Sequence, residues 1–228
     1  VKNIGNYAFY WCNGLLSVDI SDTVESIGEY AFNNCNDLIS IKIPDSVTSL
    51  GMAAVSSCYG LETAEIGNGV RKIDDYTFSY CKNLTFVTIG NNVEHIGELA
   101  FQACQKLESV TIPDSLISIG NSAFKGCSSL SSIEIPANVE TIDKYAFESC
   151  DGLKSITIYN PDCFIDSDMY DTLYSTAEIA TIYGYKGSTA QSYARDNKLD
   201  FIDLDEEKPA AEIVASGECG EEGYDLTW

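Results

Sequence analysis

The stretch Val93–Ser115, VEHIGELAFQACQKLESVTIPDS, recurs along the chain with constant spacing and without insertions or deletions. A cysteine marks its register every 23 residues, at Cys12, Cys35, Cys58, Cys81, Cys104, Cys127 and Cys150. A constant period of about 20–50 residues is typical of solenoids and other repeat arrays. The sequence therefore predicts seven 23-residue repeats over residues 1–161, and a function that depends on an extended surface.

Each repeat combines two apolar patterns, counted from Val1 as repeat position 1. Positions 8, 9, 12 and 15, which are mostly Ala, Phe, Cys and Leu, fit one face of a short helix. Positions 18 and 20 are apolar and alternate with polar residues, which predicts a strand. One repeat cannot bury its own apolar side, so the copies must stack. We therefore expect an α/β fold: a right-handed solenoid with a parallel strand face and a short-helix face.

The consensus VxxIGxxAFxxCxxLxxIxIPxx, legible in Val93–Ser115, resembles the BspA-like leucine-rich repeat family over residues 1–161. The resemblance implies a leucine-rich repeat solenoid of the kind found mostly on surface or secreted proteins of oral and gut bacteria. It also implies adhesion to host matrix proteins or to other microbes, and it brings no shared catalytic residues. The third repeat departs most from the consensus, at Leu50, Val55 and Ala64, and we expect a locally looser core there.

The period ends after Ile158, and residues 162–204 are predicted to form a C-terminal capping unit. A strand over Ile179–Tyr183 is followed by a short helix with Ser188 as its N-cap, and Phe201–Leu204 is predicted as a last strand. This strand–helix–strand segment resembles the terminal unit that commonly closes BspA-like arrays. Solenoids need such an end to cover the exposed core.

Residues 205–228 have the composition of an acidic linker. Within them, the stretch from Ala215 to Trp228 resembles the opening of a further small module found beside these repeats in gut bacterial surface proteins. The chain starts at Val1, the first position of a repeat, so we expect it to be a piece of a longer protein. Missing targeting signals therefore carry no information, and the resemblance alone implies an extracellular or cell-surface location.

The formal net charge of −22 restricts the partners that the chain can bind. A surface this acidic repels phosphate groups, which makes nucleic acid and anionic membranes poor partners. No stretch approaches the roughly 18–20 apolar residues that a membrane-spanning helix requires, so membrane insertion is not expected. The charge also keeps a long solenoid soluble, and it leaves basic proteins and cations as partners.

The seven repeated cysteines fit a buried ladder of small apolar side chains. The sequence has no Cys-x-x-Cys motif and no Cys/His cluster with zinc spacing, which argues against a metal site built from them. Cys163 and Cys219 lie outside the repeats, and whether they form a disulfide is left open because connectivity cannot be read from sequence.

No catalytic constellation emerges from the sequence. His95 is the only histidine that could activate a Ser or Cys nucleophile, and we interpret it as an ordinary surface residue at variable repeat position 3. Four acidic residues could gather around calcium, but the EF-hand order and its glycine are missing, which favours a solvated loop. These residues are Asp162, Asp166, Asp168 and Asp171. We therefore expect no enzymatic activity, no cofactor and no metal site.

The outward strand positions, 17 and 19 of each repeat, form the first candidate binding surface. They carry mostly Ser and Thr with one aromatic residue, Phe86, in the middle, which we interpret as the anchor of a shallow protein-binding face. The candidate ligand-binding residues are Asp19, Lys42, Glu65, Phe86, Thr88, Thr111 and Glu134. The alternative interpretation is that Ser and Thr simply suit exposed strand positions.

Trp11, Tyr59 and Tyr80 form a second candidate, an aromatic platform on the predicted helix side, at variable positions 11 and 13. Exposed rings there could stack on sugars, or they could fold down onto the helices. Three hypotheses of function therefore stay open. The leading one is a non-catalytic, cell-surface or secreted module that binds a protein partner. The alternatives are glycan recognition and a rigid spacer that presents another domain.

Overall fold

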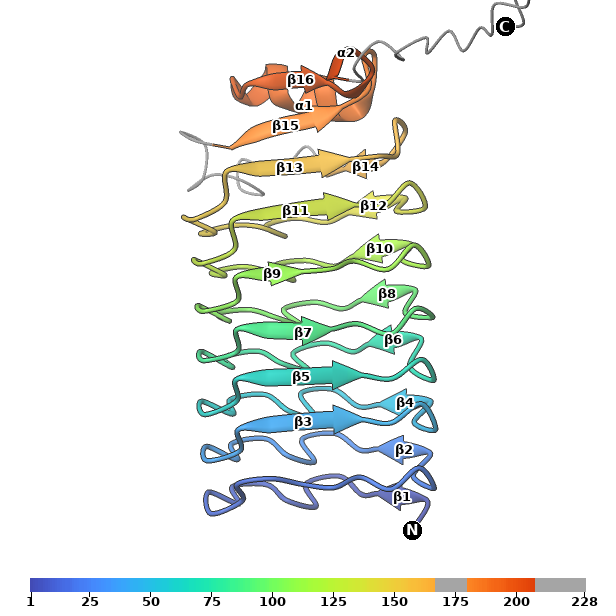
Figure 1. Ribbon diagram of the computed structural model, residues 1–228, viewed down its shortest axis with the longest axis vertical. Helices are drawn as coiled ribbons and strands as arrows, with labels where there is room; N and C mark the ends of the chain where they lie inside the picture. Colours follow the sequence, from blue (N-terminus) through green and yellow to red (C-terminus); the bar gives the residue numbers. More distant parts are fainter. Residues whose placement is uncertain (167–179, 208–228) are drawn as a thin grey trace, which may run out of the picture.

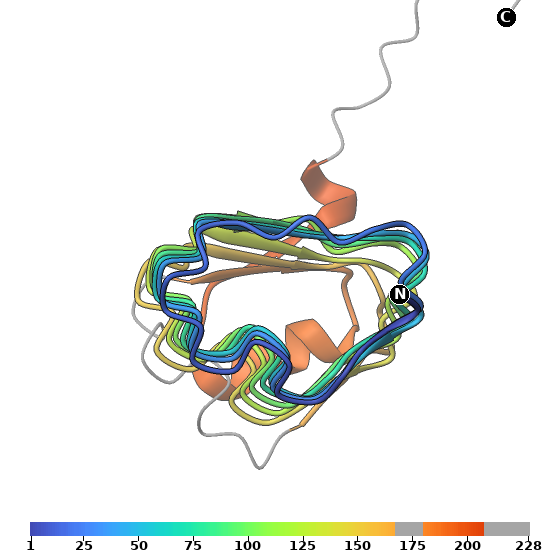
Figure 2. The same cartoon turned by 90° about the horizontal axis from the view of Figure 1, so that it is seen from below.

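The computed structural model describes residues 1–166 and 180–207 and forms a column of stacked coils (Figure 1). Each coil corresponds to one repeat, because residues 23 positions apart pair in parallel, as Ser40 does with Thr63 and Thr63 with Phe86. The predicted parallel-strand solenoid is therefore confirmed. Viewed along its axis, the column has a nearly constant outline in which successive coils superimpose (Figure 2).

One side of the column is a ladder of parallel strands at repeat positions 17–20. It consists of two four-stranded sheets: β3 (Ser40–Ile43), β5 (Thr63–Ile66), β7 (Phe86–Thr88) and β9 (Ser109–Val110), and then β11 (Ser132–Ile135) and β13 (Ser155–Ile158) with β15 (Thr181–Gly184) and β16 (Phe201–Asp203), which lie beyond the repeats. Buried and exposed residues alternate along these strands, for example in β3 and β5. The predicted inward positions 18 and 20 and outward positions 17 and 19 are confirmed.

A second ladder of two-residue strands follows repeat positions 3 and 4, and the sequence interpretation missed it. It consists of a three-stranded sheet of β1 (Asn3–Ile4), β2 (Ser26–Ile27) and β4 (Ser49–Leu50) and a five-stranded sheet of β6 (Lys72–Ile73), β8 (His95–Ile96), β10 (Ser118–Ile119), β12 (Thr141–Ile142) and β14 (Phe164–Ile165). The signal was present, since an aliphatic residue at position 4 follows a mostly polar one in every repeat. Two residues are too few for an alternating pattern to stand out.

The predicted short-helix face was wrong. In the repeats that the structure describes, positions 5–13 form consecutive turns instead of helices. Residues at positions 7 and 11 adopt left-handed backbone angles, with φ between 53° and 76°, in all seven coils. They are Tyr7, Trp11, Tyr30, Asn34, Ala53, Ser57, Tyr76, Tyr80, Leu99, Ala103, Ser122, Gly126, Tyr145 and Ser149. The described helices are confined to the C-terminal segment, so the repeats form a β-solenoid.

Hydrogen bonds between coils explain why no helix forms here. Alternate amides donate to carbonyls of the following coil: Leu99 N–H to Asn121 O (2.9 Å), Phe101 N–H to Ala123 O (2.7 Å) and Ala103 N–H to Lys125 O (2.7 Å). The intervening amides close turns within the coil, as Cys104 N–H does with Phe101 O at 3.2 Å. In a helix all of these amides would donate along the helix axis, and the carbonyl groups of the following coil would lose their hydrogen-bond donors.

This backbone makes a testable prediction at Ala103, whose φ is 56°. Ala103→Gly should change the free energy of unfolding by less than about 1 kcal/mol, because glycine accepts this conformation but gains entropy when unfolded. Ala103→Val should lower it by about 1–3 kcal/mol, since a β-branched residue is strained at positive φ. Urea unfolding would measure both, with the exposed Ala137→Val as the control. Equal stability of the two Ala103 variants would contradict the left-handed assignment.

The core consists of ladders of identical side chains between the two strand ladders and the turns. Phe78, Phe101, Phe124 and Phe147 stack in parallel with ring centroids 5.3–5.6 Å apart. Val55 interrupts this aromatic stack in the third coil but is fully buried there. The third coil therefore keeps the common fold, while its looser packing stays a prediction.

The repeated cysteines are buried free thiols, apart from the half-buried Cys12. Each thiol from the second coil onward donates to the carbonyl of repeat position 9 in the preceding coil, for example Cys104 Sγ to Phe78 O at 3.2 Å and Cys127 Sγ to Phe101 O at 3.3 Å. A small side chain with one weak donor therefore suits this position better than alanine does. Cys163 is also a buried free thiol, and Cys219 lies outside the described residues.

The C-terminal segment contains β15, then α1 (Thr189–Asn197), β16 and the single turn α2 (Leu204–Glu207). Ser188 is the N-cap of α1, as predicted, and its Oγ accepts a hydrogen bond from Gln191 N at 3.2 Å. Three residues of α1 belong to the same buried core as the coils: Ala190, Tyr193 and Ala194. In the axial view α1 lies across the end of the coil outline (Figure 2).

Several predictions from the sequence concern residues that the structure does not describe. The acidic linker with its further module, apart from residues 205–207, and Asp168 and Asp171 of the candidate calcium loop fall there. Of the same loop, Asp162 is exposed and Asp166 is half-buried. The division of the chain at residues 161 and 204 stays a prediction.

Candidate functional site

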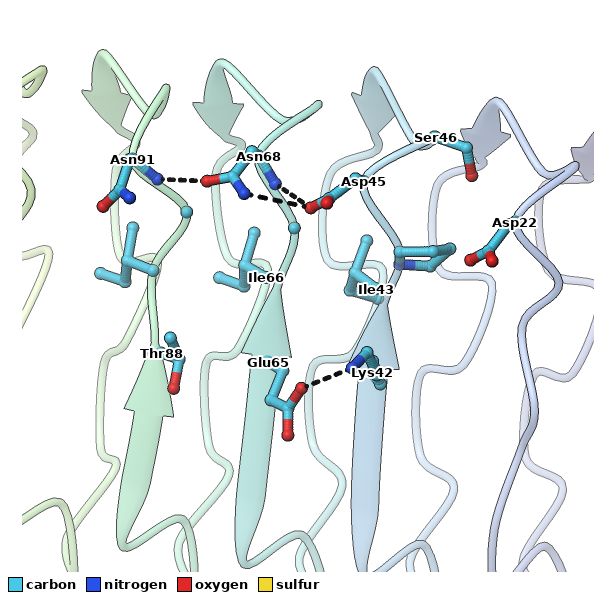
Figure 3. Close-up of a pocket in the computed structure, with 14 residues that line it drawn as sticks. Asp22, Lys42, Ile43, Asp45, Ser46, Glu65, Ile66, Asn68, Thr88 and Asn91 are labelled. Atoms are coloured by element: carbon cyan, nitrogen blue, oxygen red, sulfur yellow. Dashed lines mark hydrogen bonds and ion pairs between the residues drawn. The ribbon is translucent and has the colours of Figure 1, made fainter.

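The strand ladder ends in an open groove of about 550 Å³ in the first half of the column (Figure 3). The groove lies where β3, β5 and β7 run into the following turns, and it extends over four neighbouring coils from Asp22 to Asn91. Its volume falls within the range of about 300–1,000 Å³ that is usual for ligand sites. The groove is therefore the first candidate functional site.

Repeat position 21 changes its residue type at the groove. This position is proline at Pro44, Pro113 and Pro136, but it is glycine at Gly67 and Gly90 inside the groove. A Cβ atom at Gly67 would lie 2.6 Å from backbone atoms of the preceding coil, so close packing of the coils requires glycine. Gly90 is equally close to the coil before it, so both glycines allow the coils that line the groove to pack tightly.

A ladder of Asp and Asn side chains forms one edge of the groove (Figure 3). Asp45 Oδ1 accepts hydrogen bonds from the Asn68 backbone N–H at 2.7 Å and from Asn68 Nδ2 at 3.3 Å. Asn68 Oδ1 in turn accepts from the Asn91 backbone N–H at 2.8 Å. These bonds fix the turns of three coils relative to one another, so the edge of the groove is preorganised.

Lys42 and Glu65 lie on the outward face of neighbouring strands and form an ion pair of 3.1 Å (Figure 3). Both side chains are largely exposed to solvent, so the pair contributes only about 0–1 kcal/mol to stability. The pair neutralises the one lysine of the groove, while Asp22 and Asp45 keep it acidic. A partner that docks here therefore meets a surface with net negative charge.

Three of the seven strand-face candidates line this groove: Lys42, Glu65 and Thr88. Phe86 lies two residues before Thr88 on the same face of β7, and half of its surface (50%) is exposed. Asp19, Thr111 and Glu134 are exposed as expected but lie on other coils, the first and last of them far apart along the column. The structure thus brings together a central group of the predicted residues and separates the outer ones.

The sequence interpretation missed the Asp and Asn residues of the groove edge. The signal was repeat position 22, which carries Asp22, Asp45, Asn68, Asn91, Asp114 and Asn160, with Ala137 as the exception. These residues come directly after the strand, where Asp and Asn are common in turns. Only the stacked coils show that neighbouring copies hydrogen-bond to one another.

The second predicted site, the aromatic platform, is dispersed. Trp11, Tyr59 and Tyr80 are exposed by 58%, 44% and 43%, but no ring contact joins these three among the described residues. Trp11 contacts Tyr10 instead, with ring centroids 6.3 Å apart, and Lys82 Nζ lies 5.4 Å above the Tyr59 ring. The three rings therefore do not make one platform.

The described residues offer little for catalysis. Over 1–166 and 180–207 there is no group of three or more His, Cys, Asp or Glu side chains that could hold a metal ion. His95 Nδ1 lies 2.8 Å from Ser118 Oγ on the second ladder, outside the groove. No helix in these ranges is long and apolar enough to cross a bilayer.

The parallel coils, the leucine ladder and the 23-residue register define a leucine-rich repeat solenoid. A family model described as BspA type leucine-rich repeat region matches the chain in six copies, over residues 2–111 and 71–198. The chain therefore belongs to the BspA-type leucine-rich repeat family. It has no match among the curated proteins.

Solved bacterial structures share this fold. A leucine-rich repeat protein of Bacteroides ovatus is 26% identical with a TM-score of 0.65, and the alignment covers 81% of this chain and 53% of that one. A leucine-rich cell surface protein of Faecalibacterium prausnitzii is 27% identical with a TM-score of 0.57, covering 85% and 60%. A leucine-rich repeat protein of Eubacterium ventriosum is 32% identical with a TM-score of 0.63, covering 67% and 41%. The chain thus spans between 41% and 60% of the length of these structures.

Proposed function

We propose that the chain is a non-catalytic module of a cell-surface or secreted protein, and that it binds a protein partner through its strand face. The observation that carries this proposal is the groove at the strand ends, because it adjoins Phe86 and contains Lys42, Glu65 and Thr88. A half-exposed aromatic ring beside a hollow with polar edges is the arrangement of an interface anchor and its rim.

The shape of the strand face suits a protein better than a small molecule. Its outward residues are mostly Ser, Thr and charged residues around the single aromatic Phe86 on a parallel ladder, and the groove is open and not enclosed. A stable protein interface covers about 800 Å² on each partner, which an extended ladder can supply and a single coil cannot. The acidic groove edge favours a partner with basic residues at this place.

The extracellular location rests on the family and on its relatives. One similar structure, from Faecalibacterium prausnitzii, is that of a cell surface protein. Leucine-rich repeat solenoids act through binding surfaces, and the groove lacks a nucleophile–base pair or a metal cluster among the described residues. These observations support an adhesive role and not an enzymatic one.

Phe86→Ser tests the proposal, because serine occupies the same repeat position in five other coils and should leave the fold intact. We expect binding to a recognised protein to weaken at least about tenfold, or about 1.4 kcal/mol. The measurement is surface binding of the purified chain to immobilised host extracellular-matrix proteins and mucins.

Glu65→Lys and Glu134→Lys provide a matched pair, since both residues occupy repeat position 19 but only Glu65 lines the groove. The proposal expects Glu65→Lys to weaken binding more than Glu134→Lys does. Unchanged affinity in Phe86→Ser and Glu65→Lys would refute the strand-face site. Absence of saturable binding to every protein would instead favour the rigid spacer.

A further inference from the structure

The turns of the first two coils carry an unusual concentration of aromatic and amide side chains. We define the turn patch as Tyr7, Tyr10, Trp11, Tyr30, Asn33 and Asn34. Across residues 5–13 and 28–36 the only charged residue is Glu29. The equivalent turn of the seventh coil, residues 143–151, has four charged residues: Asp143, Lys144, Glu148 and Asp151. The turn patch is therefore a local feature and not a property of the repeat.

The rings of the turn patch are held in fixed positions, although those of Tyr7, Tyr10 and Trp11 are exposed and that of Tyr30 is half-buried. Tyr7 stacks in parallel on Tyr30 at 5.1 Å and meets the edge of Tyr10 at 5.5 Å, and Tyr10 contacts Trp11 at 6.3 Å. The backbone below them is tied to the next coil, with Tyr7 N–H donating to Glu29 O at 2.9 Å and Trp11 N–H to Asn33 O at 3.0 Å. Preorganised rings lose little entropy when a ligand binds.

The fold does not require these rings, because other coils have small residues at the same repeat positions. Position 7 is Ala53 in the third coil, position 10 is Ser56, and position 11 is Ser57, with Gly126 in the sixth coil. Tyr7 and Trp11 also adopt left-handed φ values of 59° and 60°, which large side chains rarely do. An exposed Trp at a position that accepts serine or glycine suggests a role outside the core.

The chemistry of the turn patch points to an uncharged polyhydroxylated ligand. The electron-rich faces of Tyr and Trp attract the positively polarised C–H groups of a sugar ring. The tyrosine hydroxyls can both donate and accept hydrogen bonds, as sugar hydroxyls do, and the half-buried Asn34 adds an amide whose Nδ2 also donates to the buried Asn33. No lysine or arginine is present in the patch to pair with a sulfate or carboxylate, and the net charge of −22 repels acidic glycans.

We propose that the turn patch binds neutral saccharides. This site is independent of the proposed protein-binding function, because the turns and the strand ladder lie on opposite sides of the coil outline (Figure 2). A chain with both surfaces holds a protein partner on one side and a glycan on the other.

The experiment uses the full chain with Trp228→Phe, which leaves Trp11 as the only tryptophan. This protein is screened on an array of neutral, sialylated and sulfated oligosaccharides, and each retained saccharide is then titrated while Trp11 fluorescence is followed. We expect retention of neutral saccharides and a saturable change in Trp11 emission. Retention of acidic glycans alone, or no retention, would overturn the proposal.

Affinities of the variants are compared by calorimetry with the retained saccharide. Tyr7→Ala and Trp11→Ser introduce residues that other coils already contain, so both should fold. Each is expected to weaken binding at least about tenfold. Tyr145→Ala, at the repeat position of Tyr7 in the seventh coil, should leave the affinity unchanged, and so should Phe86→Ser. Two results would show that the turn patch does not bind glycans. One is an equal saccharide affinity of the wild type and Trp11→Ser, and the other is that the turn-patch variants lose only protein binding.

Discussion

Phe101→Ala is expected to lower the free energy of unfolding by about 3–5 kcal/mol, one of the largest losses that a single substitution in this chain can cause. Phe101 is fully buried, and its ring lies between those of Phe78 at 5.4 Å and Phe124 at 5.3 Å. Alanine would remove the contacts to both neighbours and leave a cavity, because the hydrogen-bonded coils cannot move together to fill it.

The solenoid also determines how this loss would be distributed. Each coil contacts only its neighbours, so the stability of a repeat array is close to a sum of coil and interface terms. Phe101→Ala should therefore weaken the fourth to sixth coils more than the first, which hydrogen exchange of their amides would reveal. Urea unfolding gives the total loss, and Phe86→Ala, with its half-exposed ring, should cost less than about 1 kcal/mol. Equal losses in the two variants would contradict the stacked phenylalanine core.

The strand ladder and the core could be predicted because the repeat shows the same residues seven times. Leu107 and its equivalents are always leucine, and residues such as Ile133 and Ile135 alternate with outward polar ones. A single alternating tripeptide is weak evidence for a strand, whereas the same alternation in seven aligned copies is strong evidence. Because the repeat is 23 residues long, residues 23 positions apart are expected to pair between neighbouring strands.

The turn face could not be predicted because its hydrogen bonds reach outside the repeat. Apolar residues at positions 8, 9, 12 and 15 fit a helix, and the same spacing also fits turns with alternate left-handed residues. The difference depends on whether Phe101 N–H donates within its coil or to Ala123, 22 residues later. Propensities describe local preferences, and here a contact between coils overrides them.

The groove lies where neighbouring repeats differ from the others by single residues. Gly67 and Gly90 replace the prolines of other coils, and each change taken alone resembles ordinary variation in a turn. Both glycines line the groove in neighbouring coils, beside the ladder from Asp45 to Asn91. The sequence does indicate Lys42, Glu65 and Thr88, because position 19 is an outward strand position.

The buried thiols should make the protein sensitive to alkaline pH. Burial raises the pKa of Cys81 and Cys150 to about 12, and it raises the pKa of Cys104 and Cys127 well above the ordinary value. A cysteine in an unfolded chain titrates near pH 8.5. Above that pH the unfolded chain loses thiol protons that the folded chain keeps. The contribution of each thiol to stability is therefore complete below about pH 8.5 and is lost as the pH rises towards the pKa of the folded thiol, which is about 12 for Cys81 and Cys150.

The expected loss is about 1.4 kcal/mol per pH unit for each thiol, so these four together remove about 5–6 kcal/mol between pH 9 and 10. Such a loss is comparable to the whole stability of many domains, and we expect cooperative unfolding within about two pH units above pH 9. Urea titrations at pH 7, 8.5, 9.5 and 10.5 would measure it. Cys104→Ser is the control, because a hydroxyl can also donate to the Phe78 carbonyl but does not ionise in this range. The variant should lose less stability per pH unit than the wild type does, by about 1.4 kcal/mol for the one thiol removed. Identical pH dependence in both proteins would show that tyrosine ionisation, and not the thiol ladder, causes the alkaline loss.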